Sequence, residues 1–139
     1  MPELDTYSFA VAGIIFTGLR QGGKFLALDW VRRELREKTG LDFFPGTLNL
    51  RVPQQIWSEL HSRRNSLIKI ADPAAPACPG FLQRVTLTAN GIVYPHAYLI
   101  LPETTVYNDV LEIIAAENLR NALGLRDGDA VRVESAPSE

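Results

Sequence analysis

The segments of this 139-residue chain that look like β-strands are joined by short connections, and this limits the possible fold more than any other feature. Parallel strands need a crossover of a dozen or more residues, usually a helix. Only the segment 25–40 has that length together with helical spacing of its apolar residues. We therefore expect a compact, mainly antiparallel β-barrel with helices on its outside.

Residue patterns place the expected elements along the chain. Alternating or β-branched runs predict six strands within the ranges 7–17, 47–52, 81–89, 92–101, 110–115 and 130–135, and the range 66–72 could be a further short strand. Asn90-Gly91 predicts a tight hairpin turn between two of them, and Pro95 predicts an edge position or a bulge in the second. We expect a helix over 25–40 that ends at Gly40, and short helices after Pro53 and near 116–125. The ranges 18–24 and 73–80, rich in glycine and proline respectively, are expected to be loops.

Composition narrows the class of protein. The hydrophobic fraction is 46%, the charged fraction 22% and the net charge −2, which argues against a nucleic-acid backbone as the main partner. The single cysteine, Cys78, excludes an intrachain disulfide and fits a reducing compartment. The acidic start lacks the pattern of a signal peptide, and no apolar stretch reaches the length of a membrane span. We expect one domain over residues 1–139, with its core at 7–134, that is cytoplasmic and monomeric and does not bind membranes.

Two stretches in the first half of the chain could bind a phosphorylated ligand. The run Gly18-Leu19-Arg20-Gln21-Gly22-Gly23-Lys24 follows a predicted strand, and backbone amides of such loops approach phosphates closely. Its glycine spacing fits neither a Walker sequence nor a dinucleotide fingerprint, so an ordinary flexible loop is the alternative. In "FPGTLNLRV", Thr47 and Asn49 are two residues apart on a strand and point the same way. They could hold a hard cation that arrives with a nucleotide, or they could lie on a solvated face.

A third stretch, "DVLEIIAAENLR", carries a carboxylate among aliphatic residues. Glu112 interrupts a run of valine, leucine and isoleucine, and half-burial would raise its pKa toward the range of a general base. The alternative is an exposed position on an edge strand. Just beyond it, Glu117, Asn118, Leu119 and Arg120 open a short helix that could contact an anion or a base edge. In the following "LGLRDGDAVRV", Asp127 and Asp129 are interpreted as turn formers.

Taken together and in this order, "GLRQGGKF", "FPGTLNLRV" and "VLEIIAAENLRNALGLRDGDAVRV" resemble the archaeal-type, CTP-dependent riboflavin kinases over about residues 12–134. The resemblance implies a six-stranded barrel of the cradle-loop type, without the N-terminal helix-turn-helix domain that some relatives carry. It implies transfer of a phosphoryl group from CTP to the 5′-hydroxyl of riboflavin, giving FMN and CDP.

The resemblance also implies roles for individual residues. Thr47 and Asn49 match the Mg²⁺ ligands, and Glu112 matches a carboxylate near the ribityl chain of the flavin. Either Thr104 or Thr105 matches a threonine that contacts the flavin phosphate. Candidates for stacking on the flavin are Phe44, Tyr94, Tyr98 and Tyr107. The nucleotide contacts fall on residues 18–24 and on Glu117, Asn118, Leu119 and Arg120.

Two departures from the family pattern leave alternatives open. Arg20 stands where the family usually has a second glycine, and Ala115-Ala116 stands where it often has Ala-Pro. If the position of Arg20 needs a positive φ, arginine is strained there, and otherwise Arg20 is itself a candidate contact for phosphate. A barrel that binds flavin or a nucleotide without transfer is one alternative function. A DNA-binding barrel is another, and the acidic balance argues against it.

Overall fold

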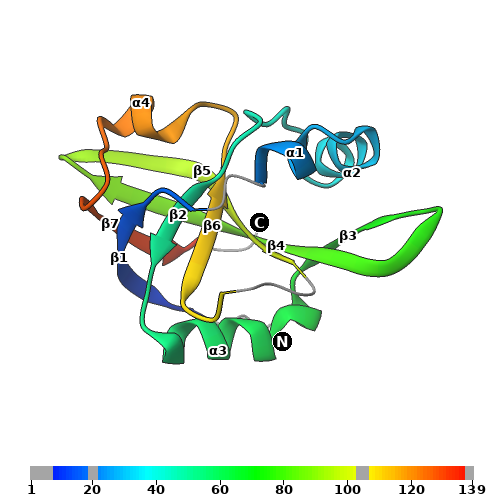
Figure 1. Ribbon diagram of the computed structural model, residues 1–139, viewed down its shortest axis with the longest axis horizontal. Coiled ribbons are helices and arrows are strands. Elements are labelled where there is room, and N and C mark those ends of the chain that lie inside the picture. The colour runs from blue at the N-terminus through cyan, green and yellow to red at the C-terminus, as the bar shows by residue number, and fades with distance from the viewer. Residues whose placement is uncertain (1–7, 19–21, 103–106, 137–139) are drawn as a thin grey trace.

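Six antiparallel strands close into a barrel in the computed structural model, which describes residues 8–18, 22–102 and 107–136 (Figure 1). Around the barrel each strand pairs with the next, and the last strand pairs with the first. The order is β4 (Ala75–Ala89), β5 (Ile92–Pro102), β6 (Val110–Ile114), β2 (Leu48–Arg51), β1 (Ala10–Phe16) and β7 (Ala130–Ser135). The predicted mainly antiparallel six-stranded barrel is therefore confirmed. A seventh strand, β3 (Ile68–Asp72), pairs with β4 outside the closed ring.

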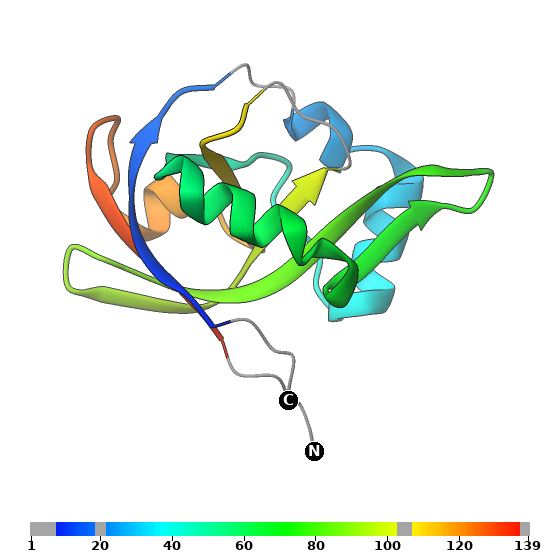
Figure 2. The ribbon, with the colours of Figure 1, turned by 90° about the horizontal axis from the view of Figure 1, so that it is seen from below.

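Successive side chains of each strand point to opposite faces, and the side chains that point into the barrel are mainly aliphatic. In β2, Leu48 and Leu50 point inward, and in β6 Leu111 and Ile113 do the same, each at most 4% exposed. One end of the barrel is covered by α3 (Gln54–Ser62), whose Leu60 joins this core (Figure 2). The short helix α4 (Leu119–Leu123) lies at the opposite end (Figure 1). A 3₁₀ turn, η1 (Arg64–Ser66), leads from α3 into β3.

Two helices cover part of the outer face of the sheet and form a second core. These are α1 (Gly22–Leu26) and α2 (Asp29–Thr39), which are seen together on one side of the barrel in Figure 1. Leu26 and Val31 pack with Ile100 and Ile114, which point outward from β5 and β6. The strands β5 and β6 therefore have apolar contacts on both faces where the helices lie. Among the described residues, no helix is long and apolar enough to cross a membrane.

The predicted hairpin and its irregularity are both confirmed. Asn90 and Gly91 have φ angles of 52° and 76°, as a type I′ turn requires. The register between β4 and β5 shifts from Val85 opposite Ala97 to Leu87 opposite Tyr94. Two residues, Pro95 and His96, therefore face one residue on β4, which is the bulge expected at this proline.

The helix predicted over 25–40 is wrong in one respect, because it is two helices. The first begins at Gly22, inside the predicted loop, and Leu28 between the helices is extended, with φ −67° and ψ 138°. On one straight helix, Leu26 and Val31 would point about 140° apart, and the break lets both reach the same core. The end at Gly40, in the left-handed conformation with φ 77°, is as predicted.

The loop predicted over 73–80 is also wrong, because β4 begins at Ala75. Pairing of β4 with β5 starts only at Gly80, and the register with β3 shifts between Ile70 opposite Gly80 and Asp72 opposite Ala75, so Pro79 lies in an irregular part of the strand with no paired residue. Proline lacks an N–H group and is tolerated in such a position. This part of β4 projects with β3 away from the barrel (Figure 1).

Candidate functional site

A row of four side-by-side residues crosses the outer face of the barrel. Phe16 on β1 pairs with Asn49 on β2, Asn49 pairs with Glu112 on β6, and Glu112 pairs with Ile100 on β5. Their chain neighbours in β2 and β6 point into the core, so the row faces outward. We call Phe16, Asn49, Glu112 and Ile100 the strand row. Residues directly opposite on antiparallel strands have Cβ atoms about 5 Å apart, so the pairing brings Asn49 and Glu112 together.

Glu112 has the environment that its sequence context indicated. Its side chain is half-buried, beside Ile100 in the row and two residues before Ile114, and both isoleucines belong to the core under α1 and α2. Burial raises the pKa of the Glu112 carboxyl above its ordinary value, because the ionised form loses solvation. The carboxyl therefore has more affinity for a proton than an exposed glutamate.

Two oxygen atoms lie together at the start of β2. Thr47 Oγ1 donates a hydrogen bond to Asn49 Oδ1 at 3.1 Å. On the other side of the amide, Gly18 approaches so closely that a Cβ atom at this glycine would lie 2.2 Å from Asn49 Nδ2. Only glycine fits at position 18 without moving the Asn49 side chain. Gly18 and Thr47 thus hold the amide between them, with its oxygen toward Thr47.

The two oxygens fit one edge of a magnesium site. Mg²⁺ binds oxygen ligands at about 2.0–2.1 Å in an octahedron, so neighbouring ligands lie about 3 Å apart. The separation of Thr47 Oγ1 and Asn49 Oδ1 is 3.1 Å. Neutral ligands suit an ion whose charge is balanced by phosphates. The described residues contain no cluster of three or more histidine, cysteine, aspartate or glutamate side chains that could hold a metal.

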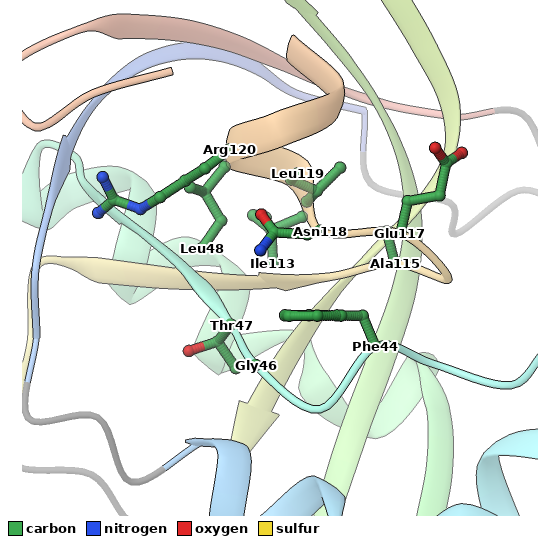
Figure 3. A pocket seen from close by; sticks show the side chains of 10 residues that line it. All are labelled: Phe44, Gly46, Thr47, Leu48, Ile113, Ala115, Glu117, Asn118, Leu119 and Arg120. Carbon is green, nitrogen blue, oxygen red and sulfur yellow. The ribbon is translucent and has the colours of Figure 1, made fainter. Parts of the chain in front are cut away.

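Thr47 also lines a pocket of about 200 Å³ that lies beside the strand row. In Figure 3 the ring of Phe44, seen edge-on, faces the side chain of Asn118 across this pocket, and the carboxylate of Glu117 points away from the ring. The backbone N–H of Phe44 donates to the carbonyl of Ala115 at 2.8 Å, which ties the two sides together. The residues that line the pocket are Phe44, Gly46, Thr47, Leu48, Ile113, Ala115, Glu117, Asn118, Leu119 and Arg120.

All four residues of the predicted stretch 117–120 line this pocket, and each has a different local role. The Asn118 side chain caps α4 by accepting a hydrogen bond from the backbone N–H of Asn121 at 3.2 Å. Leu119 is buried in the barrel core. Glu117 accepts a hydrogen bond from the Tyr94 hydroxyl at 3.2 Å. Burial, followed by the nearby carboxylate of Glu117, raises the pKa of Tyr94.

The fourth residue, Arg120, is bound by a carboxylate that the sequence did not mark as part of a site. Arg120 Nη2 donates to Asp127 Oδ1 at 2.7 Å, and Thr17 Oγ1 donates to Asp127 Oδ2 at 2.9 Å. The hydrogen bond from Arg120, then that from Thr17, lowers the pKa of Asp127. Asp127 does lie in a turn, as predicted, since the adjacent Gly128 has φ 94°. In the sequence, Asp127 precedes Gly128, and this pattern indicates a turn but does not indicate a contact with Arg120.

The remaining candidate residues fall into two groups. Leu19, Arg20, Gln21, Thr104 and Thr105 lie outside the described residues. The predicted loop does not extend through Gly22, Gly23 and Lys24, which belong to α1. A Cβ atom at Gly23 would lie 2.9 Å from the carbonyl oxygen of Pro45, so α1 packs closely on the turn before Thr47.

The four aromatic candidates lie in four different places. Phe44 lines the pocket and Tyr94 contacts Glu117 at its edge. Tyr98 packs edge-to-face on Phe43 beside the helical core, with ring centres 5.8 Å apart. Tyr107 packs edge-to-face on Phe16, with ring centres 6.0 Å apart, and so lies at one end of the strand row.

Comparison with known proteins gives one family. The family model described as "CTP-dep_RFKase: Domain of unknown function DUF120" matches residues 15–134. A riboflavin kinase from Archaeoglobus fulgidus is 34% identical over 137 residues, which cover 94% of this chain and 56% of the relative. One from Pyrobaculum aerophilum is 35% identical over 133 residues, covering 91% and 60%. One from Saccharolobus solfataricus is 30% identical over 139 residues, covering 94% and 76%.

The match covers most of the chain but not all of each relative. The chain spans 56% and 60% of the length of the Archaeoglobus and Pyrobaculum proteins. Its matched range, 15–134, runs from β1 through β7 and so includes the strand row and the pocket. The chain belongs to the CTP-dependent riboflavin kinase family.

Proposed function

We propose that this domain transfers the γ-phosphoryl group of CTP to the 5′-hydroxyl of riboflavin, giving FMN and CDP. The observation that carries the proposal is the pairing of Asn49 with Glu112, together with the hydrogen bond that joins Asn49 to Thr47 in the pocket. The proposed ion ligands Thr47 and Asn49 lie between the proposed proton acceptor Glu112 and the pocket, which supports these roles. Phosphoryl transfer needs these parts, because its catalysis is mainly positioning and charge stabilisation.

The pocket supports binding of the nucleotide. The ring of Phe44 gives it a flat apolar wall, which suits stacking of a base, and Arg120 gives it a positive charge. A pocket of about 200 Å³ with an arginine in its lining suits part of a nucleotide, whose phosphates are anionic. We therefore assign Phe44 to the nucleotide, and we place riboflavin on the side of Glu112.

Thr47 and Asn49 are the residues that would hold Mg²⁺. When bound, the ion would neutralise charge on the phosphates of the nucleotide. Gly18 contributes by leaving room for the Asn49 amide, so its role in this site is steric. This adds a reason for a glycine at the first position of the Gly-rich segment.

Glu112 would orient the 5′-hydroxyl of riboflavin and accept its proton. The hydroxyl oxygen forms a bond to the γ-phosphorus while the bond from that phosphorus to the β–γ bridging oxygen breaks, and the proton passes to the carboxylate. The raised pKa of Glu112 supports this role, because a base is most effective when its pKa approaches the working pH. Its half-buried place in the strand row also limits competition from water.

The direct test is formation of FMN. The purified protein is incubated with riboflavin, Mg²⁺ and one of CTP, ATP, GTP or UTP, and FMN and the nucleoside diphosphate are separated by chromatography. We expect FMN with CTP and little with the purine nucleotides. FMN formed best with ATP would correct the donor while keeping the reaction. No FMN with any of the four nucleotides, from protein that is folded by circular dichroism, would contradict the proposed function.

A further inference from the structure

The turn between α4 and β7 is held firmly against β1. The backbone N–H of Gly128 donates to the carbonyl of Ile15 at 2.8 Å, and the N–H of Ile15 donates to the carbonyl of Asp129 at 2.9 Å. Within the turn, Asp129 accepts a hydrogen bond from the N–H of Arg126 at 2.9 Å through its side chain. These bonds extend the pairing of β1 with β7 beyond the last paired residues. These hydrogen bonds therefore fix the backbone on the C-terminal side of Asp127 against β1.

The carboxylate of Asp127 joins two segments that border the two parts of the site. One oxygen accepts from Arg120, which lines the pocket. The other accepts from Thr17, which precedes Gly18, the residue packed against the Asn49 amide. A single side chain thus connects the pocket to the segment that supports the candidate metal ligand.

We propose that Asp127 is a positioning residue for nucleotide binding: it holds Arg120 at the pocket and Thr17 beside the candidate ion site. This inference rests on the proposed function. A free arginine side chain has many rotamers, and ordering it on binding opposes affinity. The hydrogen bond to Asp127 uses one of the five N–H donors of Arg120, so the others remain for phosphate or a base edge.

A role in stability alone does not explain the arrangement. The side chains of Arg120 and Asp127 are 36% and 53% exposed, and ion pairs between such exposed groups contribute little to folding stability. Loss of the carboxylate should therefore change nucleotide affinity more than the melting temperature. This difference separates a positioning role from a structural one.

The test compares two aspartates of the same turn. Asp127→Asn removes the charge that Arg120 binds, and Asp129→Asn is the matched control, because its amide oxygen can still accept from Arg126. The dissociation constant of CDP with Mg²⁺ is measured by calorimetry without riboflavin, and KM is measured for CTP and for riboflavin. We expect Asp127→Asn to weaken CDP binding about tenfold and to raise KM for CTP by a similar factor. KM for riboflavin, and the melting temperature, should remain near those of the wild type.

A second comparison shows whether Asp127 acts through Arg120. Arg120→Met should weaken CDP binding, and adding Asp127→Asn to it should weaken binding little further, since the two side chains act as a pair. Thr17→Val removes the other hydrogen bond and should have a smaller effect in the same direction. If Asp127→Asn does not fold, Thr17→Val and the single Arg120 variant still decide: normal CDP affinity in both would overturn the proposal.

The outcomes separate this inference from the proposed reaction. Unchanged CDP affinity in Asp127→Asn would overturn the positioning role, even if the wild type forms FMN. Full additivity with Arg120→Met would overturn it as well. A wild-type protein that binds CDP through Arg120 and Asp127 but forms no FMN would contradict the reaction alone. A wild-type protein without affinity for CDP would overturn both.

Discussion

The strand row and the pocket are neighbours, but they are built in different ways. Asn49 and Glu112 are opposite each other because β2 and β6 pair, so their relation depends on backbone register. The pocket is built from the turn at Phe44, the segment 115–118 and the start of α4. Thr47 belongs to the pocket and also donates to Asn49, so it connects the two regions.

The difference suggests that the strand row serves catalysis and the pocket serves nucleotide recognition. Positions set by a β-sheet vary little, which suits groups that must hold an ion and a proton acceptor close together. Side chains on turns and a short helix are more adaptable, which suits recognition of a nucleotide. Substitutions in the strand row should therefore act mainly on turnover, and substitutions in the pocket mainly on KM for the nucleotide.

The largest effect is expected at Glu112. Glu112→Gln keeps the shape of the side chain and removes its capacity to accept a proton, so the turnover number should fall about 100-fold or more. KM for CTP should change little, because Glu112 does not line the pocket. Turnover is measured from initial rates of FMN formation at saturating CTP. Near-normal turnover in this variant would show that Glu112 is not the base.

A second substitution in the strand-row region tests the metal ligands through their support. In Gly18→Ala the new Cβ atom would lie 2.2 Å from Asn49 Nδ2, so the amide must move. A displacement of about 1 Å in a catalytic group can reduce the rate up to about 100-fold, and we expect a loss of about 10- to 100-fold. The Mg²⁺ concentration for half-maximal rate should also rise.

Gly40→Ala is the matched control for that variant. Gly40 caps α2 with φ 77°, and a Cβ atom there would meet no atom within 4 Å. This control should lose about 1 kcal/mol of stability, because alanine is strained in the left-handed conformation, and should keep its Mg²⁺ dependence. If both alanine variants respond to Mg²⁺ as the wild type does, the steric role of Gly18 is wrong.

The pocket should respond differently. Phe44→Leu removes the flat ring, and loss of base stacking is expected to reduce affinity by about 1–2 kcal/mol, or about tenfold in KM for CTP. Phe43→Leu is the matched control, because Phe43 packs on Tyr98 beside the helical core and does not line the pocket. It should lower the melting temperature more than it changes KM. A rise in KM for riboflavin instead of CTP in Phe44→Leu would reassign this ring to the flavin.

Much of the fold was predictable because its signals are local. Asn90-Gly91 specifies its turn through positive φ angles, and alternation in 47–52 specifies which residues face the core. The two errors arose from tertiary context. The break at Leu28 depends on how Leu26 and Val31 share one core, and the strand from Ala75 depends on its pairing with β3.

The candidate site was predictable to a different extent. Asn49 and Glu112 are unusual for their local patterns, and Thr47 is two residues from Asn49 on the same face of its strand. The proximity of Asn49 and Glu112 follows from strand register. Asp127 was interpreted only as a turn former, since an aspartate before glycine is common in turns. Its contacts with Thr17 and Arg120, 110 and 7 residues away, exist only in the folded chain. The close approach of Gly18 to Asn49 likewise exists only in the folded chain.

The smallest expected effect is on the way the free energy of unfolding depends on pH. Glu112 and Asp127 should contribute to this dependence with opposite signs. Burial raises the pKa of Glu112 in the folded state, so the folded protein holds its proton more tightly than the unfolded chain does. Below the ordinary glutamate pKa of about 4.3 both states are protonated, and Glu112→Gln should match the wild type. As pH rises through the folded-state pKa, ionisation lowers the stability of the wild type, and the glutamine variant should become the more stable protein.

Asp127 should show the opposite sign. Its hydrogen bonds lower its pKa, so they stabilise the folded wild type above the ordinary aspartate pKa and lose this effect as pH falls through the lowered value. Asp127→Asn should therefore be slightly less stable than the wild type near neutral pH, with a small difference because the group is exposed. Urea unfolding of the three proteins between about pH 2.5 and pH 8 measures both signs, because the range extends below the ordinary pKa of both carboxyl groups. If Glu112→Gln gives no gain in stability at neutral pH, ionisation of Glu112 imposes no cost on the fold, and its affinity for a proton must come from the bound substrates.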